Sequence, residues 1–275
     1  MRRIFAAVLV AVVSCLASPA ARAAGNHALR VGSDISYAPL EFYAQGSRHA
    51  RGFDLDLIRA VAGKMGRPVT IVNHDFSTLL SAVQQGRLDL GISAITDTRA
   101  RERQVNFVDY LLVGTGMLVP RGNPHHVFNL GGLCGLTVDL QAGTSQQAAV
   151  RAQSKECRSV GLGPVHILAF PTDVAAFKAF AAGRSDVHLS DYPVVAYLAL
   201  TVGHGKRYEV VGRQFSVAPY GIAVAKNRPA LLAAVRRALQ GVIADGTYDR
   251  LLKKWGLVQA ALRSVPINAG PLFER

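Results

Sequence analysis

One arginine and several small polar side chains follow a short apolar stretch near position 90, in a spacing that suits the binding of an anion. Residues 88–92 alternate as a strand does, and a threonine, Thr98, precedes Arg101 by three residues. A threonine there caps a helix, whose start offers free N–H groups and partial positive charge. The small side chains that lead into this turn are Ser93, Thr96 and Thr98. We expect Thr98 and Arg101 to form a cradle for a small carboxylate; in the alternative, Thr98 caps an ordinary surface helix and Arg101 is solvated.

The pattern of residues 80–93 recurs over residues 177–190 without a gap. Each copy predicts an amphipathic helix ended by glycine, a Gly-Arg-x-Asp turn and a strand that ends in serine, at Ser93 and at Ser190. Ligands of open α/β sheets lie beyond the carboxyl ends of the strands. We therefore expect Ser93 at one part of the site and Ser190 with Asp191 at another. A packing solution repeated without function is the alternative.

The first 23 residues have the form of a signal peptide. Arg2 and Arg3 precede the apolar run 4–13, and Ala21-Arg22-Ala23 is a typical cleavage site, so the mature chain should begin near Ala24. A lipid-anchored Cys15 is the alternative, because residues 12–15 loosely resemble a lipobox. No later segment has the roughly 20 apolar residues of a membrane span. We expect an exported, periplasmic protein.

The cysteines and the net charge indicate which kinds of site and partner this exported protein can have. Cys134 and Cys157 remain as an even pair in an oxidising compartment, which predicts a disulfide, and two cysteines without a nearby histidine pair make a metal site unexpected. Loss of the signal peptide's three arginines lowers the formal charge from +13 to +10. The basic residues are dispersed and not interleaved with aromatic ones, which argues against nucleic acid. An anionic envelope or an acidic partner face suits this charge better.

The elements that must position these residues predict an α/β protein with an inserted lobe. The predicted strands are 29–33, 69–72, 137–140, 166–170 and 187–189, and the predicted helices begin near 52, 77 and 229. The strand 29–33 opens into a polar loop with Asp34, Tyr37 and Glu41, and the turn 141–146 is rich in donors. Two apolar runs, 112–119 and 220–225, flank a self-contained block. We predict lobe 1 from residues 24–114 and 219–275, lobe 2 from residues 115–218, and two strand crossings as the hinge.

In this order, several motifs resemble the extracellular solute-binding proteins of the polar amino-acid ABC importers, family 3. The motifs are residues 32–41 (GSDISYAPLE), 52–57 (GFDLDL), Thr98-x-x-Arg101 with Phe107-x-Asp109, 143–145 (GTS), Ser190-Asp191, 245–248 (DGTY) and 254–256 (KWG). The resemblance covers nearly the whole mature chain and implies a clamshell of the type II periplasmic-binding-protein fold. Asp97 departs from the family, which usually has an apolar residue at that place.

The resemblance also implies roles for individual residues. It places the ligand's carboxylate on Arg101 and its ammonium on Asp191, with Tyr37 and Phe76 beside the ligand side chain. Arg101 is preferred to Arg99 and Arg103 because it keeps the spacing to Thr98 and to Phe107. A zwitterion that enters a closed cleft loses hydration, which a bidentate arginine and a carboxylate can replace. The complete predicted ligand set is Asp34, Tyr37, Phe76, Ser93, Thr96, Thr98, Arg101, Gln141, Thr144, Ser145 and Asp191.

The resemblance implies a monomeric binding protein that delivers an amino acid to an ABC transporter permease, and no cofactor. An enzyme of the cyclohexadienyl dehydratase type is the alternative, because those exported enzymes resemble the same clamshell. For the ligand, Asp34 and Glu41 would favour a cationic side chain if they face inward, whereas Gln141 would favour an amide. We expect a polar amino acid that is uncharged or basic.

Overall fold

The computed structural model describes residues 27–44 and 46–274. The predicted signal peptide and Cys15 lie outside the described residues. Within the described part, no helix is long and apolar enough to cross a membrane. The helices are α1 (Phe53–Lys64), α2 (Phe76–Gln84), α3 (Arg99–Glu102), α4 (Ser145–Ser159), α5 (Asp173–Ala181), α6 (Tyr192–Thr201), α7 (Pro229–Ala244) and α8 (Thr247–Trp255), with 3-10 turns η1 (Leu130–Leu133), η2 (Val202–Gly205), η3 (Val258–Ala260) and η4 (Gly270–Leu272).

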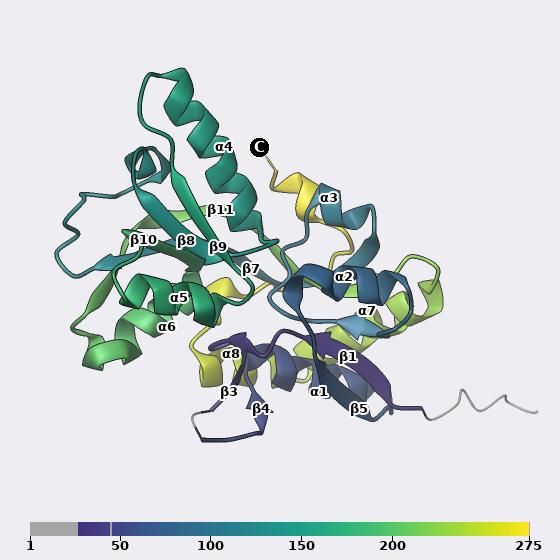
Figure 1. The fold of residues 1–275 in the computed structure, drawn as a ribbon. Helices are drawn as coiled ribbons and strands as arrows, with labels where there is room; N and C mark the ends of the chain where they lie inside the picture. Colours follow the sequence, from purple (N-terminus) through teal and green to yellow (C-terminus); the bar gives the residue numbers. More distant parts are fainter. Residues whose placement is uncertain (1–26, 45, 275) are drawn as a thin grey trace, which may run out of the picture.

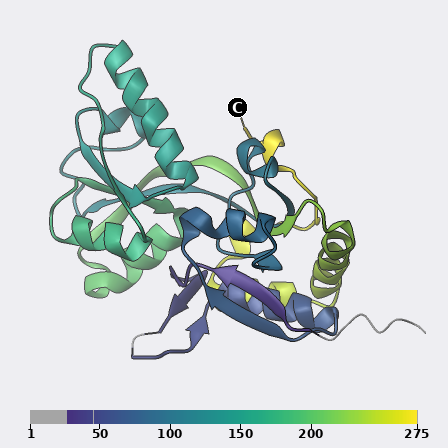
Figure 2. The same ribbon diagram turned by 45° about the vertical axis from the view of Figure 1, so that its right-hand side comes forward.

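Eight strands form one sheet in the order β5-β1-β6-β11-β7-β10-β8-β9. These strands are β1 (Leu29–Ser33), β5 (Val69–Asn73), β6 (Leu90–Gly91), β7 (Val105–Pro120), β8 (Thr137–Gln141), β9 (His166–Phe170), β10 (Val187–Asp191) and β11 (Tyr208–Ala225). β1 runs parallel to β5 and β6, and β8 runs parallel to β9 and β10. A small second sheet holds β2 (Ser36–Tyr37), β3 (Glu41–Tyr43) and β4 (Ala50–Arg51). In Figures 1 and 2, α4, α5 and α6 gather around β8, β9 and β10, whereas α1 and α7 lie by β1 and β5.

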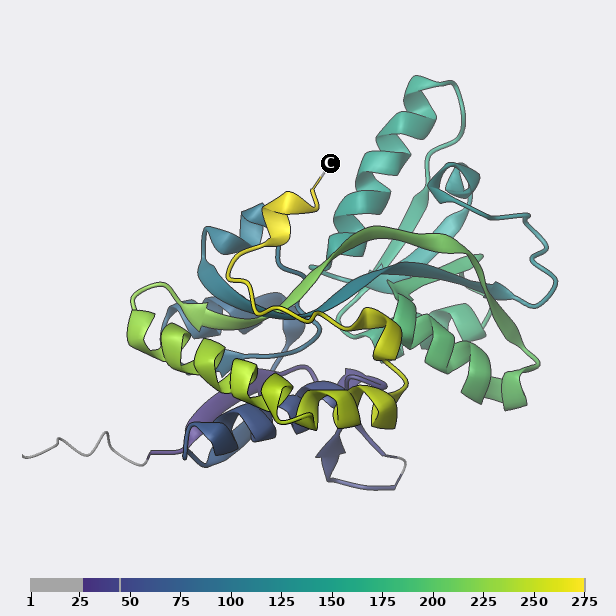
Figure 3. The same ribbon diagram turned by 180° about the vertical axis from the view of Figure 1, so that it is seen from behind.

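The strands β7 and β11 pair antiparallel from one half of the molecule into the other, as the view from behind shows (Figure 3). Their register shifts between Val211 and Phe215, between Phe215 and Ala218, and between Tyr220 and Gly221. Such irregularities let a strand pair bend and twist. The predicted crossings near 112–116 and 219–221 lie inside these two strands, which are longer than the apolar runs indicate.

The two long strands β7 and β11 contribute buried apolar residues to two different core clusters. One large cluster contains residues of β1, α1, α7 and α8 together with residues 108–113 of β7 and 220–224 of β11. A second cluster contains residues of β8 and α4 together with residues 117–119 of β7. Met117 and Val211 belong to the second cluster, and Val113 and Tyr220 belong to the first. This division falls near the predicted lobe boundaries at residues 114 and 218. That the two lobes move as separate bodies remains a prediction.

Most predicted elements are present, and two are shorter than expected. β1 and β9 have the predicted bounds, and α7 begins at the predicted residue. The strand predicted over residues 88–92 is only Leu90–Gly91, because residues 86–89 still belong to the turn. In this turn the Asp89 carboxylate accepts a hydrogen bond from the Arg30 amide at 2.9 Å. The helix after Thr98 has only four residues, since β7 starts at Val105.

Candidate functional site

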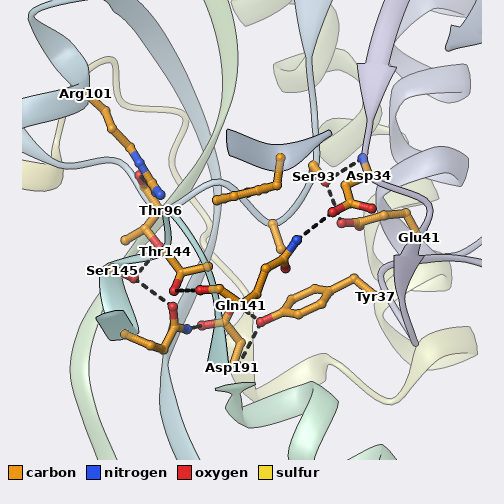
Figure 4. Close-up of a pocket in the computed structure, with 13 residues that line it drawn as sticks. Asp34, Tyr37, Glu41, Ser93, Thr96, Arg101, Gln141, Thr144, Ser145 and Asp191 are labelled. Atoms are coloured by element: carbon orange, nitrogen blue, oxygen red, sulfur yellow. Dashed lines mark hydrogen bonds between the residues drawn. The ribbon is translucent and has the colours of Figure 1, made fainter. Parts of the chain in front are cut away.

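A small cavity lies where the carboxyl ends of β1, β6, β8 and β10 meet the starts of α2 and α4 (Figure 4). Its lining residues are Asp34, Tyr37, Glu41, Phe76, Ser93, Ala94, Thr96, Arg101, Gln141, Thr144, Ser145, Gln146 and Asp191. Ten of the eleven predicted ligand residues line it, and Thr98 does not. Its free volume is about 10 Å³, room for about one water molecule, so an amino acid needs the surrounding elements to part.

The Arg101 side chain reaches this cavity and joins two distant segments. Its Nη1 donates to the Thr96 carbonyl at 2.8 Å and its Nη2 donates to the Gly143 carbonyl at 3.2 Å. Its guanidinium carbon lies 5.3 Å from the centre of the Phe76 ring. Burial lowers the pKa of Arg101 to about 10, which leaves it charged at neutral pH. A planar cation with replaceable carbonyl partners is suited to a ligand carboxylate.

The backbone N–H groups of the predicted anion cradle are partly paired within the protein. Thr98 does cap α3, and its hydroxyl accepts from the Arg101 amide at 3.2 Å. The Arg99 amide donates instead to a carboxylate oxygen of Glu274 at 2.8 Å. Two N–H groups of this four-residue helix are therefore already paired, and only the Arg101 side chain lines the cavity. The choice of Arg101 over its neighbours agrees with the geometry, since Arg99 and Arg103 are exposed.

Asp191 lies across the cavity in a dense hydrogen-bond network. The Tyr37 hydroxyl donates to one carboxylate oxygen at 2.9 Å and accepts from the Asp191 amide at 3.0 Å. Gln146 donates to the other carboxylate oxygen at 2.6 Å. Burial raises the pKa of Asp191 to about 6, against the opposing influence of these hydrogen bonds and of Arg101. The residue therefore carries a fully paired carboxylate at neutral pH.

Ser190, which the sequence predicts at the site, lies behind Tyr37 and outside the cavity lining, in a buried polar chain whose other members, Asp173, His188 and Asp139, sequence reasoning missed. The Ser190 hydroxyl lies 2.8 Å from the Tyr37 hydroxyl and 2.8 Å from the Asp173 carboxylate. His188 follows, with Nε2 3.7 Å from Asp173 and Nδ1 2.6 Å from Asp139. Neighbouring Asp139 and Asp173 raise the pKa of His188 against the lowering effect of burial. The alternation of His188 and Ser190 with apolar neighbours in β10 was a signal that one strand face carries polar groups.

Two further carboxylates face the cavity from the first part of the chain. Gln141 donates to one Asp34 oxygen at 2.6 Å, and Ser36 donates to the other at 2.9 Å. Ser93 donates to one oxygen of Glu41 at 2.8 Å, while the other Glu41 oxygen is buried and has no hydrogen-bond partner among the described residues. Burial raises the pKa of Asp34, and burial together with the nearby Asp54 raises that of Glu41 further. Both side chains thus face inward, the arrangement that favours a cation.

Asp97 has a structural place outside the cavity lining. Its carboxylate accepts from the Gly270 amide at 2.9 Å, and Asp109 accepts from the Ala269 amide at 3.1 Å. These two bonds hold the C-terminal segment against β7. Burial, with the nearby charges of Asp109 and Glu102, raises the pKa of Asp97 to about 8. The departure from the family noted in the sequence therefore serves anchoring, which its residue type alone did not reveal.

The predicted disulfide between Cys134 and Cys157 is confirmed. It joins the segment before β8 to α4, and neither cysteine lines the cavity. For metals, the described residues contain no group of three or more histidine, cysteine or acidic side chains placed to hold an ion.

Comparison with known proteins adds four findings. The sequence profile of the bacterial extracellular solute-binding proteins, family 3, matches residues 29–258. The arginine-binding protein ArgT of Corynebacterium glutamicum is 35% identical over 247 residues, which cover 89% of this chain and 79% of that protein. A solved ancestral arginine-binding protein bound to arginine is 33% identical with a TM-score of 0.76, over 83% of this chain and 97% of the other. The ancestral amino acid-binding protein AncCDT-1, a precursor of cyclohexadienyl dehydratase, is 31% identical with a TM-score of 0.73, over 83% and 95% of the two chains.

Proposed function

Because this chain belongs to the bacterial extracellular solute-binding proteins, family 3, and has the type II periplasmic-binding-protein fold, we propose that it captures a basic amino acid, with L-arginine as the leading ligand. It then passes the ligand to the permease of an ABC importer. Family members are periplasmic or extracellular, and we propose that this chain acts in the periplasm as a monomer after its signal peptide is removed.

The charge of the cavity carries the choice of a basic ligand. The carboxylate of a zwitterion needs one cation and its ammonium needs one carboxylate. Arg101 and Asp191, which both line the cavity, would fill these two roles. Asp34 and Glu41 then remain in the same lining, and among the lining residues Arg101 is the one cation. Buried carboxylates without a counter-charge are unfavourable, and a guanidinium offers five donors in a plane. Asp34 with Glu41 is therefore the proposed subsite for the ligand's cationic end.

We propose that the ligand replaces contacts that now join the two lobes. Gln141 to Asp34, Tyr37 to Asp191 and Arg101 to the Gly143 carbonyl all pair a group of residues 27–114 with a group of residues 137–191. An amino acid would exchange these partners for its own carboxylate, ammonium and guanidinium. Tyr37 and Phe76 would flank its side chain, and Ser93, Thr96, Gln141, Thr144 and Ser145 would supply the remaining hydrogen bonds.

We propose that the free protein in solution also populates an arrangement with the lobes apart, which admits the amino acid, and that the gain of both sets of contacts then favours the closed arrangement. Small-angle scattering of the protein with and without saturating L-arginine tests this step. We expect a smaller radius of gyration with the amino acid. An unchanged radius with a tightly bound ligand would contradict closure.

Calorimetric titration with L-arginine, L-lysine, L-glutamine and L-glutamate tests the ligand class. We expect arginine to bind most tightly and glutamate least. The variant Asp34→Asn should weaken arginine about 10- to 100-fold and glutamine much less, since only arginine loses a charged partner. Equal loss for both ligands, or preference for glutamate, would refute the subsite.

The enzyme alternative is tested with the same protein. Relatives of this chain are binding proteins, and AncCDT-1 links the fold to a dehydratase. We expect incubation with prephenate or arogenate to yield no aromatic product. Product formation at a rate that depends on Glu41 or Asp191 would favour the enzyme.

A further inference from the structure

A second cavity lies directly behind the amino-acid site, on the other side of the contact between Tyr37 and Asp191. Tyr37 lines the first cavity, and Pro39, two residues later, lines the second. In the same way Asp191 lines the first and Tyr192 lines the second. The second cavity encloses about 400 Å³, which is within the range of small-molecule sites.

The walls of this groove are aromatic and come from both predicted lobes. Trp255 of α8 meets Phe42 of β3 edge to face at 5.9 Å between ring centres, and the Phe42 ring centre lies 6.2 Å from that of Tyr197 in α6. Leu200, also in α6, is 76% exposed at the groove. Both walls are therefore present only while α6 stays close to β3 and α8 (Figure 1).

The charge of the groove is opposite to that of the amino-acid cavity. Its lining contains Arg51 and Lys254 and no carboxylate. Lys254 is paired with Asp56 at 2.7 Å, whereas no carboxylate of residues 27–44 or 46–274 lies within ion-pair distance of Arg51. The Arg51 guanidinium carbon stands 5.0 Å from the Phe42 ring centre and 6.0 Å from that of Trp255. An uncompensated cation beside aromatic rings suits a ligand with a carboxylate and an apolar body.

We propose that this groove is a second binding site, for a small apolar carboxylate, and that its occupancy is coupled to the approach of the two lobes. The carboxylate lies by Arg51 and the apolar body lies between Trp255 with Phe42 and the α6 wall. Because the ligand touches both walls, it favours the arrangement in which they are close. Linkage then requires a reciprocal effect on the amino acid in the neighbouring cavity.

The single tryptophan of the chain, Trp255, makes the groove directly observable. Titration of the intact mature protein with 3-phenylpropionate, without any amino acid, should change tryptophan fluorescence with a Kd below about 1 mM. The neutral amide of the same acid should bind about 5-fold more weakly, the range of one partly exposed charge contact. Absence of binding, or equal binding of acid and amide, would overturn the site.

Two variants and one control locate the ligand. Arg51→Gln should weaken 3-phenylpropionate to the level of the amide, and Ala196→Phe, which fills the groove from α6, should abolish binding while the circular dichroism spectrum stays native. The matched control Arg237→Gln removes an exposed arginine of α7 outside the groove and should bind as wild type. Unchanged binding in Arg51→Gln together with Ala196→Phe would place the probe elsewhere and refute the proposal.

The coupling has its own readout. The titration is repeated with saturating amounts of the amino acid that binds the cavity most tightly, and we expect the Kd of 3-phenylpropionate to fall by a factor of about 5 or more. An unchanged or higher Kd would contradict the coupling. The first titration uses no amino acid, so a failure of the proposed arginine function leaves the test of the groove intact.

Discussion

Replacement of Arg101 by methionine tests the centre of the proposed mechanism. Methionine keeps an unbranched side chain over Phe76 and removes both guanidinium donors. Two charge-assisted hydrogen bonds contribute gross about 3 to 6 kcal/mol, but in the free protein Arg101 already donates to the carbonyls of Thr96 and Gly143. The net loss is therefore about 2 to 4 kcal/mol, on the order of 30- to 1000-fold in affinity. Calorimetry with L-arginine measures it directly.

Arg99 supplies the matched control. Its side chain is 68% exposed and, among the described residues, forms an ion pair with Glu274 alone, at 3.6 Å, so Arg99→Met removes a nearby cation without touching the cavity. We expect wild-type affinity in Arg99→Met and a native unfolding temperature in both variants. The reasoning is refuted if Arg101→Met binds normally, or if Arg99→Met loses affinity to the same extent.

Three more predictions follow from buried or constrained groups. Burial raises the pKa of Asp191 to about 6, and only its carboxylate form accepts an ammonium, so the calorimetric Kd for the amino acid should rise about tenfold per pH unit below about pH 6. Asp97 has a folded-state pKa raised to about 8 from its usual 3.8, so the fold binds an extra proton between these values and loses stability as pH rises through them. Thermal unfolding of Asp97→Asn should match wild type near pH 3.5 and exceed it by at least about 4 °C near pH 8.5, with the difference growing between these values. An equal difference at both pH values would contradict this origin. Reduction of Cys134–Cys157, which are separated by 23 residues, should lower the urea-derived free energy of unfolding by about 3 kcal/mol and leave arginine affinity unchanged.

Much of the fold could be predicted from local patterns. β1 and α7 lie where alternation and helical spacing predict them, because each buries one apolar face, whereas β9 has its predicted bounds although its residues are only partly buried or exposed. The repeat of residues 80–93 at 177–190 correctly located two helix and strand pairs. The lengths of β7 and β11 were missed, since Gly114 and Gly116 interrupt the apolar pattern: a side chain at Gly116 would meet Val195 at 2.4 Å.

Sequence reasoning predicted the cavity residues that follow a strand end. It did not predict contacts that depend on a partner far away in the sequence. Asp34, Ser93, Gln141 and Asp191 lie at strand ends, whose common edge sequence reasoning can anticipate. The Arg99 amide donates to Glu274, which lies 175 residues further along the chain. Local sequence patterns do not reveal such long-range pairs, so the pairing of the Arg99 amide with Glu274 and the anchoring role of Asp97 could not be predicted.

The amino-acid cavity holds buried carboxylates, although the whole chain has a formal charge of +13. Asp34 and Asp191 are each satisfied by neutral amide or hydroxyl donors, chiefly Gln141, Gln146 and Tyr37. Neutral donors pair a carboxylate without cancelling its charge, so a cationic ligand still gains when it displaces them, whereas an anion does not. Behind the wall of Tyr37 and Asp191, the groove reverses this arrangement with arginine over aromatic rings. Opposite charges on two sides of one contact between the lobes would therefore direct the proposed basic zwitterion to one cavity and the proposed apolar anion to the other.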